Sequence, residues 1–284
     1  MISEECSCEQ LGPDLIRVRV PNVANPGGQA TNIYIAGTSP AVLIDAGSDD
    51  GGRRVMRALA HFGIASIERI ILTHAHQDHA GAAPAIRAAL GAEIFIHPRE
   101  LSDPAYQPVK LGPVNPLREG DAIDAGSFCL CVIETPGHAP GHVSLYDPER
   151  RALFSGDLVS GQGTVAVVPP RGSMSAYLAS LRRVAQLEID VIYPGHGPVI
   201  TAPQERIERY IDRRQSRERE IYDAVASGLA TSSAIADRLY PDVVPRFRRA
   251  AEGTVRAHLL HLVEQGLIRV DGASSDGELR YVCA

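Results

Sequence analysis

The 284-residue chain lacks the features that would link it to a polyanion or a membrane. It has no tryptophan, which excludes no fold, and no excess of basic residues, since its net charge at pH 7 is −6. That charge argues against a general attraction to nucleic acid or to anionic lipid. No apolar run approaches the roughly 20 residues that span a bilayer. We therefore expect a protein without a membrane partner.

Targeting signals and cysteine pairs are also scarce. The stretch from Met1 to Cys6 is acidic and has neither the basic start nor the apolar core of a secretory signal. The five cysteines include Cys6 and Cys8, but no second pair completes a metal site with them, so we expect reduced thiols. These absences predict a cytoplasmic protein.

The length fits one large domain, or one of about 200 residues plus a small one.

The most informative stretch is His74-Ala75-His76-Gln77-Asp78-His79, which places three histidines and an aspartate in six positions. Residues 67–72 before it have the pattern of a buried strand, and residues 82–90 after it have that of a helix. We therefore expect the motif in a loop at the end of a strand, where binding residues are often found. Imidazole and carboxylate groups are ligands for borderline divalent metals. The motif therefore predicts part of a metal site.

Other predicted strands also end beside residues that can bind a metal. His142 lies in a Gly- and Pro-rich turn, and Asp157 and His196 each follow a short predicted strand. Asp45 ends another strand, where it either braces a neighbouring site or forms a turn. Recurrence of such residues at strand ends is typical of a metal site along the edge of a sheet.

The predicted ligand set has seven members, too many for one tetrahedral zinc ion but suited to two ions that share a bridging ligand. Its members are His74, His76, Asp78, His79, His142, Asp157 and His196. Asp157, with two carboxylate oxygens, is the natural bridge. A nitrogen-rich set without thiolate favours Zn²⁺, and Mn²⁺ or Fe also accept such ligands. Two ions can hold a bridging hydroxide and lower the pKa of bound water toward ~7, which predicts a hydrolase with Asp78 as a catalytic residue.

Two regions beyond this set could contact a substrate. Residues 101–119 form a long Pro- and Gly-rich segment that either binds substrate, through Tyr106 and Lys110, or is a plain surface loop. Residues 204–226 form a highly charged helix. Its basic positions between Arg206 and Arg219 either contact phosphates or belong to a solvated face.

The C-terminal residues have the pattern of a winged helix. Predicted helices over 234–239 and 248–265 are followed by predicted strands over 267–270 and 279–282. The helix that would enter a DNA groove carries both arginines and glutamates. We therefore expect packing or dimerisation rather than DNA binding.

The complete ligand pattern resembles the metallo-β-lactamase superfamily over roughly residues 14–200. The resemblance implies an α+β fold: an αββα sandwich over residues 1–202 with a small winged-helix-like domain over 203–284. It implies that His74, His76 and His142 hold one metal, that Asp78, His79 and His196 hold the other, and that Asp157 bridges them. It also implies that Asp45 supports the ligands and that His138 is not a ligand.

A closer resemblance is to the lactamase-beta-like group, which carries a winged helix at its C-terminus. It rests on Asn25–Gly27, Thr31–Asn32, Gly161–Thr164, the run from Tyr193 to Ile200 and part of the charged helix. Animal members of that group are mitochondrial endoribonucleases that act on single-stranded RNA, and fungal relatives are thioesterases.

Three functions follow from these patterns, in order of preference. The first is a binuclear zinc hydrolase of a small-molecule acyl substrate with an activated carbonyl, namely a thioester, a lactone or another ester. The second is a single-stranded RNA endoribonuclease, whose binding should weaken steeply with salt. The third is a winged-helix DNA-binding protein, which the complete ligand set argues against.

Overall fold

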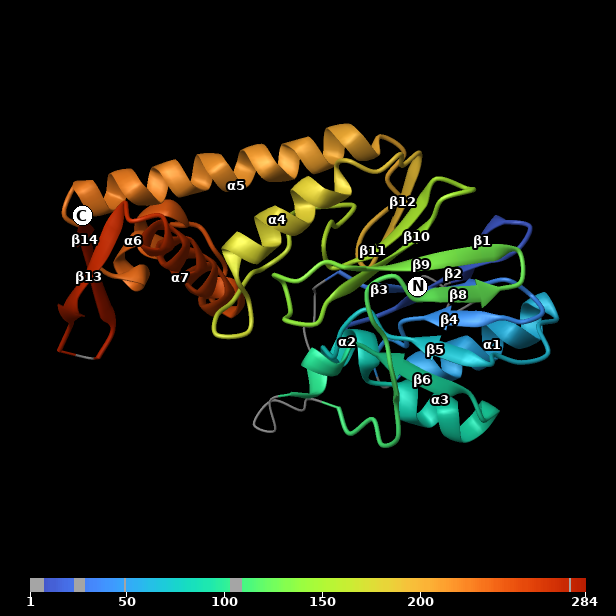
Figure 1. Ribbon diagram of the computed structural model, residues 1–284. Coiled ribbons are helices and arrows are strands. Elements are labelled where there is room, and N and C mark those ends of the chain that lie inside the picture. The colour runs from blue at the N-terminus through green and yellow to red at the C-terminus, as the bar shows by residue number, and fades with distance from the viewer. Residues whose placement is uncertain (1–7, 23–28, 49, 103–108, 276) are drawn as a thin grey trace. The chain divides into compact units, whose positions relative to one another are not determined.

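Figure 1 shows the computed structural model of the chain, which describes residues 8–22, 29–48, 50–102, 109–275 and 277–284. The chain divides into two compact units that alternate along the sequence. The first comprises Met1–Glu134, Gly141–Gly163 and Glu188–Pro203, and the second comprises Thr135–Pro140, Thr164–Leu187 and Gln204–Ala284. Of the residues singled out above, Asn25–Gly27, Tyr106 and Cys6 lie outside the described residues.

The first unit contains two β-sheets. The larger has seven strands in sequence order: β1 (Cys8–Gly12), β2 (Leu15–Val20), β3 (Thr31–Ala36), β4 (Val42–Ile44), β5 (Arg69–Ile71), β6 (Glu93–Ile96) and β7 (Asn115–Pro116). Its first four strands pair antiparallel, and β4 to β7 pair parallel. The larger sheet is therefore mixed, and its parallel half contains the strand that leads into the histidine motif.

The smaller sheet has five strands: β8 (Ala122–Ala125), β9 (Phe128–Glu134), β10 (Val143–Asp147), β11 (Ala152–Gly156) and β12 (Val191–Pro194). Their order is β12-β11-β10-β9-β8, and only β11 and β12 pair parallel. The short 3-10 helix η1 (Pro98–Leu101) follows β6 of the larger sheet.

Apolar side chains from both sheets form one core layer. Tyr34 and Ile44 of the larger sheet pack in the same buried cluster as Leu130, Leu145 and Phe154 of the smaller one. The strands on which these residues lie are apolar on the facing side because two stacked sheets must bury that side. The two sheets are therefore packed face to face.

Helices cover the other face of the larger sheet. Helix α1 (Gly51–Phe62) and helix α3 (Ala83–Leu90) lie along it, as Figure 1 shows. Val55 of α1 and Ile86 of α3 are buried in one cluster with Leu43 and Ile70 of the sheet. The helical periodicity of these apolar positions explains why both segments fold as helices that pack on a sheet.

The second unit contains α4 (Met174–Val184), α5 (Pro203–Ala226), α6 (Ser232–Leu239), the 3-10 helix η2 (Pro245–Phe247), α7 (Arg248–Glu264) and the hairpin β13 (Ile268–Ala273) with β14 (Leu279–Cys283). Thr231 begins α6 by accepting a hydrogen bond from the Ala234 amide at 3.3 Å. Ile221, Leu259 and Tyr281 share the core of this unit. The predicted helices and C-terminal hairpin are confirmed.

The predicted domain division between residues 202 and 203 stays a prediction. Within the second unit, α4 packs against α7, so residues 164–187 group with the C-terminal region. Arg256 of α7 strengthens that packing by donating a hydrogen bond to the Pro169 carbonyl at 2.7 Å.

Two sequence-based expectations need amendment. Strands β1, β7 and β8 were not predicted, because all three are short and lie at sheet edges. Free thiols are found at Cys129, Cys131 and Cys283, but Cys8 is disulfide-bonded, so the expectation of reduced thiols is wrong for Cys8. The number of cysteines does not show which of them meet in space. Among the described residues, no helix has the length and apolar character needed to cross a membrane.

Candidate metal centre

The candidate site lies on loops that follow parallel strands. In the larger sheet, β4 leads into Asp45 and β5 leads into the histidine motif. In the smaller sheet, β11 leads into Asp157 and β12 leads into His196. Because the carboxyl ends of neighbouring parallel strands lie at the same edge, each sheet brings two ligand-bearing loops together.

The motif is partly helical, which corrects the expectation of a loop. Residues Gln77–Ala80 form the short helix α2, which begins after His76. The amides of His79 and Ala80 donate to the His76 carbonyl at 3.0 and 2.8 Å. The turn brings His79 beside His74, with the two ring centres 4.2 Å apart, so residues on both sides of the helix start contribute to the site.

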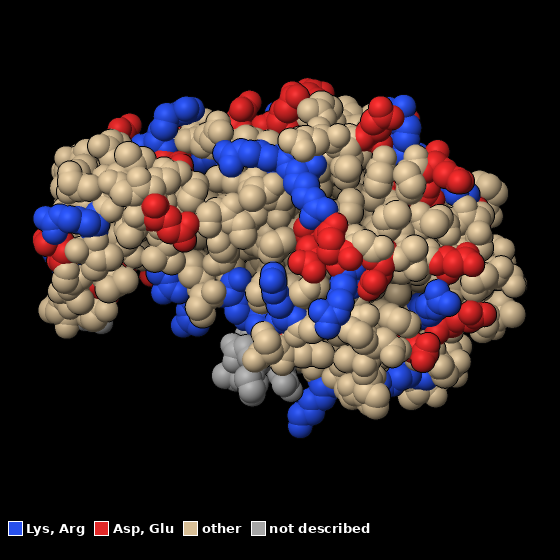
Figure 2. All heavy atoms as spheres, in the orientation of Figure 1, with Lys and Arg blue, Asp and Glu red and all other residues tan. Residues whose placement is uncertain are grey.

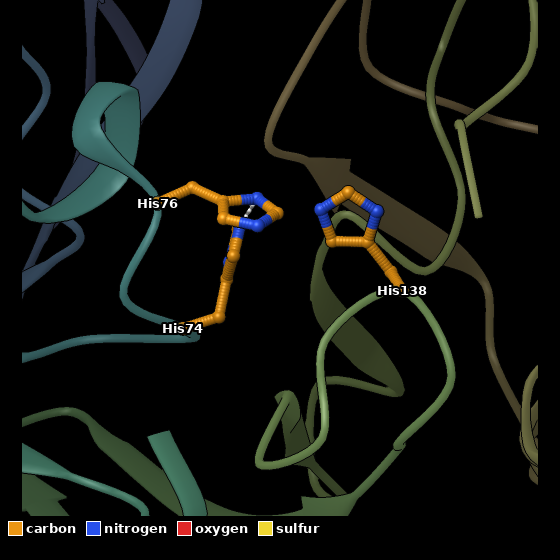
Figure 3. Close-up of side chains that lie close together, drawn as sticks. All are labelled: His74, His76 and His138. Carbon is orange, nitrogen blue, oxygen red and sulfur yellow. Dashed lines mark hydrogen bonds between the residues drawn. The ribbon is translucent and has the colours of Figure 1, made fainter. Parts of the chain in front are cut away.

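His74 and His76 lie against each other at the end of β5. Their Nε2 and Nδ1 atoms are 2.9 Å apart, and the rings are nearly perpendicular (Figure 3). His74 is fully buried, and its Nδ1 lies 3.0 Å from the Thr73 hydroxyl, which orients the ring. His138, also labelled in Figure 3, belongs to the second unit, where its Nδ1 lies 2.8 Å from the Ala166 carbonyl oxygen.

Asp78, His79, Asp157 and His196 form a cage of four donor atoms. The Nε2 atoms of His79 and His196 are 3.4 Å apart, and each lies 3.4 Å from Asp157 Oδ1. Asp78 Oδ2 lies 3.4 Å from His196 Nε2 and 3.9 Å from His79 Nε2. In a tetrahedral zinc site with Zn–N near 2.05 Å, neighbouring donors are roughly 3.3 Å apart. The cage therefore fits a divalent cation in both donor chemistry and spacing.

His142 completes the network of predicted ligands. It is fully buried, and its Nε2 accepts a hydrogen bond from the Asp157 amide at 2.9 Å. Its ring centre lies 5.3 Å from that of His74. The structure thus connects all seven predicted ligands through direct contacts within the first unit. Within the described residues of the first unit, two groups of three have their donor atoms within 4.8 Å of one another, and both groups include His79: His74, His79, Asp157 and Asp78, His79, His196.

The electrostatics of this cage favour positive charge. Burial alone would lower the pKa of His196, but the carboxylates of Asp157 and Asp78 raise it to about 10. Burial likewise opposes protonation of His79, yet Asp157, Asp45 and Asp78 raise its pKa well above the usual value. Burial alone would raise the pKa of Asp157, but the nearby His196 and His79 hold it well below its usual range. A site that stabilises extra protons in this way also stabilises a metal cation.

Asp45 supports the site from behind. Its carboxylate, which is 2% exposed, accepts hydrogen bonds from the Thr73 amide and the Thr73 hydroxyl. Its Oδ2 lies 2.7 Å from His79 Nδ1, which directs Nε2 of that ring toward the cage. Asp45 has φ of 59°, a conformation that Asp and Asn adopt more readily than most residues. Of the two predicted roles for Asp45, bracing a neighbouring site fits these contacts better than forming a turn.

Two glycines, Gly156 and Gly195, allow the ligand-bearing loops to lie close to one another. A Cβ at Gly156, whose φ is +48°, would lie 2.7 Å from His142 Nε2. A Cβ at Gly195 would lie 2.8 Å from His79 Cε1 and 2.9 Å from Asp157 Oδ1. Side chains at these positions would displace the donor atoms, so glycine is required for the site to close.

The His196 loop is held by residues of β3. Asn32 donates to the carbonyls of Pro194 and Gly197 at 2.9 and 2.8 Å, and the Tyr34 hydroxyl donates to Pro194 at 2.8 Å. These bonds fix the loop to the larger sheet, although its strand belongs to the smaller one.

Two further residues of the site, Asn22 and Glu100, were not predicted from the sequence. Asn22 Nδ2 donates to Asp78 Oδ2 at 2.8 Å, and Glu100 accepts from two backbone amides of the ligand loops. Asn22 lies just after β2, and Glu100 lies just after β6. The rule used for the ligands, a polar residue after a strand, would have identified both if it had been applied to every strand.

Comparison with known families assigns the protein to a class. A sequence model of the metallo-beta-lactamase superfamily matches residues 25–196, and a model of the beta-lactamase associated winged helix domain matches residues 231–277. The chain belongs to the metallo-beta-lactamase superfamily and is a hydrolase of that superfamily. The predicted fold class, a metallo-β-lactamase sandwich followed by a winged helix, is confirmed.

Individual relatives are similar over most of the chain. The "Beta-lactamase-like protein 2 homolog" of Caenorhabditis elegans is 31% identical over 89% of this chain and 89% of its own length. The "Atrochrysone carboxyl ACP thioesterase" of Aspergillus fumigatus is 34% identical over 84% of this chain and 78% of its own length. A solved structure described as a di-iron-bound form of the protein TTHA1623 is 34% identical, with a TM-score of 0.54, and covers 63% of this chain and 93% of its own.

Proposed function

We propose that the protein is a binuclear, zinc-dependent hydrolase of activated carbonyl substrates: thioesters, lactones or other esters. The observation that carries this proposal is the cage of Asp78, His79, Asp157 and His196 in the same site as the paired rings of His74 and His76. His74, His76 and His142 would hold one ion. Asp78, His79 and His196 would hold the other, and Asp157 would lie between them.

Bound divalent cations supply a nucleophile from water at neutral pH and polarise the substrate oxygen. The chain positions the groups around them. Asp78 is ionised at neutral pH, because the charges of His79 and His196 lower its pKa although burial opposes this. Its Oδ2 is held by Asn22 and faces the cage, so Asp78 can accept a proton there.

The kind of metal is a separate part of the proposal. The donor set of histidine nitrogens and carboxylate oxygens favours zinc. The relative with a di-iron form shows that a protein 34% identical to this chain has been found with iron. Elemental analysis of the purified protein distinguishes the two metals.

The choice of an acyl substrate is supported by the thioesterase name of the Aspergillus relative and by the pairing of the arginines on α5. Arg209 pairs with Glu205 at 3.1 Å, and Arg217 pairs with Glu220 at 3.1 Å. Arg214 is 5% exposed. Figure 2 shows acidic and basic side chains interspersed over the face in view. Arg209 and Arg217 are therefore neutralised and Arg214 is buried, which reduces the positive charge that α5 offers to an RNA backbone and favours the acyl substrate.

The test is a substrate panel on zinc-loaded protein: an acyl thioester, a lactone, a β-lactam and single-stranded RNA. We expect hydrolysis of the thioester or lactone and at least a roughly 100-fold loss in Asp78→Ala, which removes a ligand and a proton acceptor. Asp50→Ala is the control, because Asp50 pairs with Arg53 and Arg54 instead of lining the cage. Cleavage of RNA alone would refute the proposed substrate class, and full activity of Asp78→Ala would refute the mechanism.

A further inference from the structure

We infer that Glu100 is a positioning residue that fixes two ligand loops relative to each other and supports only one of the two metal positions. The inference rests on the proposed metal-dependent function. It concerns the position formed by His74, His76 and His142.

Glu100 joins two loops that are far apart in sequence. It belongs to η1, and its Oε2 accepts a hydrogen bond from the Ala75 amide at 3.0 Å. Its Oε1 accepts one from the Gly141 amide at 2.7 Å. Ala75 lies between His74 and His76, and Gly141 directly precedes His142. One carboxylate therefore sets the separation of the three histidines.

The surroundings of Glu100 make this contact rigid. Its side chain is only 1% exposed, so its two oxygens depend on protein hydrogen bonds to replace those lost to water. The turn fits tightly against it, because a Cβ at Gly141 would lie 2.7 Å from His97 Nδ1 and 3.1 Å from Glu100 Cγ. Movement of the turn would therefore break a buried hydrogen bond.

Glu100 and Asp45 support the site in different ways, although Asp45 also reaches His74 through the Thr73 hydroxyl. Asp45 contacts Thr73 and His79, and its contact with His79 acts on the cage of Asp78, His79 and His196. Glu100 instead contacts the backbone amides of Ala75 and Gly141, which are next to His74, His76 and His142. Removal of Glu100 should therefore weaken one metal position and spare the other, which a general loss of stability would not do.

The experiment is a titration of metal-free full-length protein with Co²⁺, followed by calorimetry and by the visible absorption of the bound ion. Wild type should bind two equivalents. Glu100→Gln keeps one acceptor oxygen and replaces the other with a donor that faces an amide. We expect one equivalent to bind as in wild type and the other to weaken roughly 10- to 100-fold, with an altered absorption spectrum.

Asp147→Asn is the matched control. Asp147 is also fully buried and accepts hydrogen bonds from two backbone amides, those of Glu149 and Arg150, but it contacts no ligand loop. It should lower the melting temperature and leave both Co²⁺ affinities unchanged. Wild-type affinity for both ions in Glu100→Gln would overturn the inference. Binding of fewer than two ions by wild type would instead refute the binuclear site itself.

A measurement on wild type covers the case in which Glu100→Gln does not fold. In metal-free protein, the amides of Ala75 and Gly141 should exchange with solvent far more slowly than unbonded loop amides, because Glu100 binds both. Zn²⁺ should slow them further by ordering the loops. Exchange of both amides at the rate of unbonded loop amides would overturn the inference.

Discussion

The contact between Asp45 and His79 predicts that Asp45→Asn impairs metal binding without unfolding the protein. The carboxylate accepts from Thr73 through Oδ1 and lies 2.7 Å from His79 Nδ1 through Oδ2. Asparagine has the same shape and tolerates the φ of 59° at this position. If its oxygen keeps the bonds to Thr73, its amide nitrogen faces His79 Nδ1 and donates a hydrogen bond to it.

The consequence is a change of tautomer in His79. With aspartate, Nδ1 carries the proton and Nε2 presents its lone pair to the cage. With asparagine, Nδ1 becomes the acceptor and Nε2 carries the proton, which must be lost or moved before a metal binds. Forcing the original tautomer leaves a buried donor unpaired, at a cost of about 1–3 kcal/mol. This corresponds to a loss of zinc affinity of roughly 5- to 150-fold.

The assay is competition with a chromophoric chelator for Zn²⁺, together with urea unfolding of the metal-free protein. We expect weaker zinc binding in a protein that still unfolds in one cooperative transition, because asparagine keeps the bonds to Thr73 and the new tautomer restores the hydrogen bond to His79. Asp147→Asn serves as the control for loss of a buried charge. Unchanged zinc affinity in Asp45→Asn would show that Asp45 does not orient His79.

Three further predictions concern the site, the core and the second unit. Gly195→Ala should reduce bound zinc below two equivalents with unchanged circular dichroism, because its Cβ would lie 2.8 Å from His79 Cε1. Phe154→Ala, at a core position that is 1% exposed, should cost about 3–5 kcal/mol in urea unfolding. His258 has a lowered pKa because it is buried, so the unfolded chain binds its proton more readily below pH about 6.5. Stability should therefore fall as pH drops from 7 toward 5, and His258→Gln should flatten that fall.

Each of these predictions has its own control. Gly52→Ala, whose Cβ meets nothing nearer than 3.7 Å, should keep two zinc equivalents, and equal losses in both glycine variants would contradict the steric argument. Phe154→Leu should cost clearly less than Phe154→Ala, and equal costs would speak against a packing effect. Substitution of the exposed His61 by Gln should leave the pH profile as in wild type. The same acid-induced fall in His258→Gln would assign that fall to another group.

Much of the fold and of the ligand set could be predicted because the relevant signals are local. The apolar pattern of residues 67–72 predicted the strand that leads into the site, and the density of histidines from His74 to His79 predicted the metal motif. His142, Asp157 and His196 could be added because each follows a strand and has small neighbours. Such signals need only the period of a strand and the chemistry of a ligand.

The remainder depends on contacts between distant residues. Nothing in the local sequence distinguishes Glu100 from other glutamates, because its role comes from the position of η1 between two loops. Likewise, the arginines of α5 form a basic cluster in the sequence, and only the folded chain shows their acidic partners. Asp45 orients the ring of His79, which lies 34 residues further along the chain, so this role also depends on the folded structure. No local pattern encodes which donor a buried carboxylate meets, so these roles require the folded chain.

The origin of the ligands has a consequence for the lifetime of the protein. Asp78 and His79 follow a strand of the larger sheet, whereas Asp157 and His196 follow strands of the smaller sheet. A cation held by all four would act as a cross-link between the two sheets at one edge of the core. Such an ion binds the folded chain and not the unfolded one. The free energy of unfolding therefore rises with the logarithm of the free ion concentration once that concentration exceeds the dissociation constant. Metal supply would then control how fast the protein is degraded as well as whether it is active.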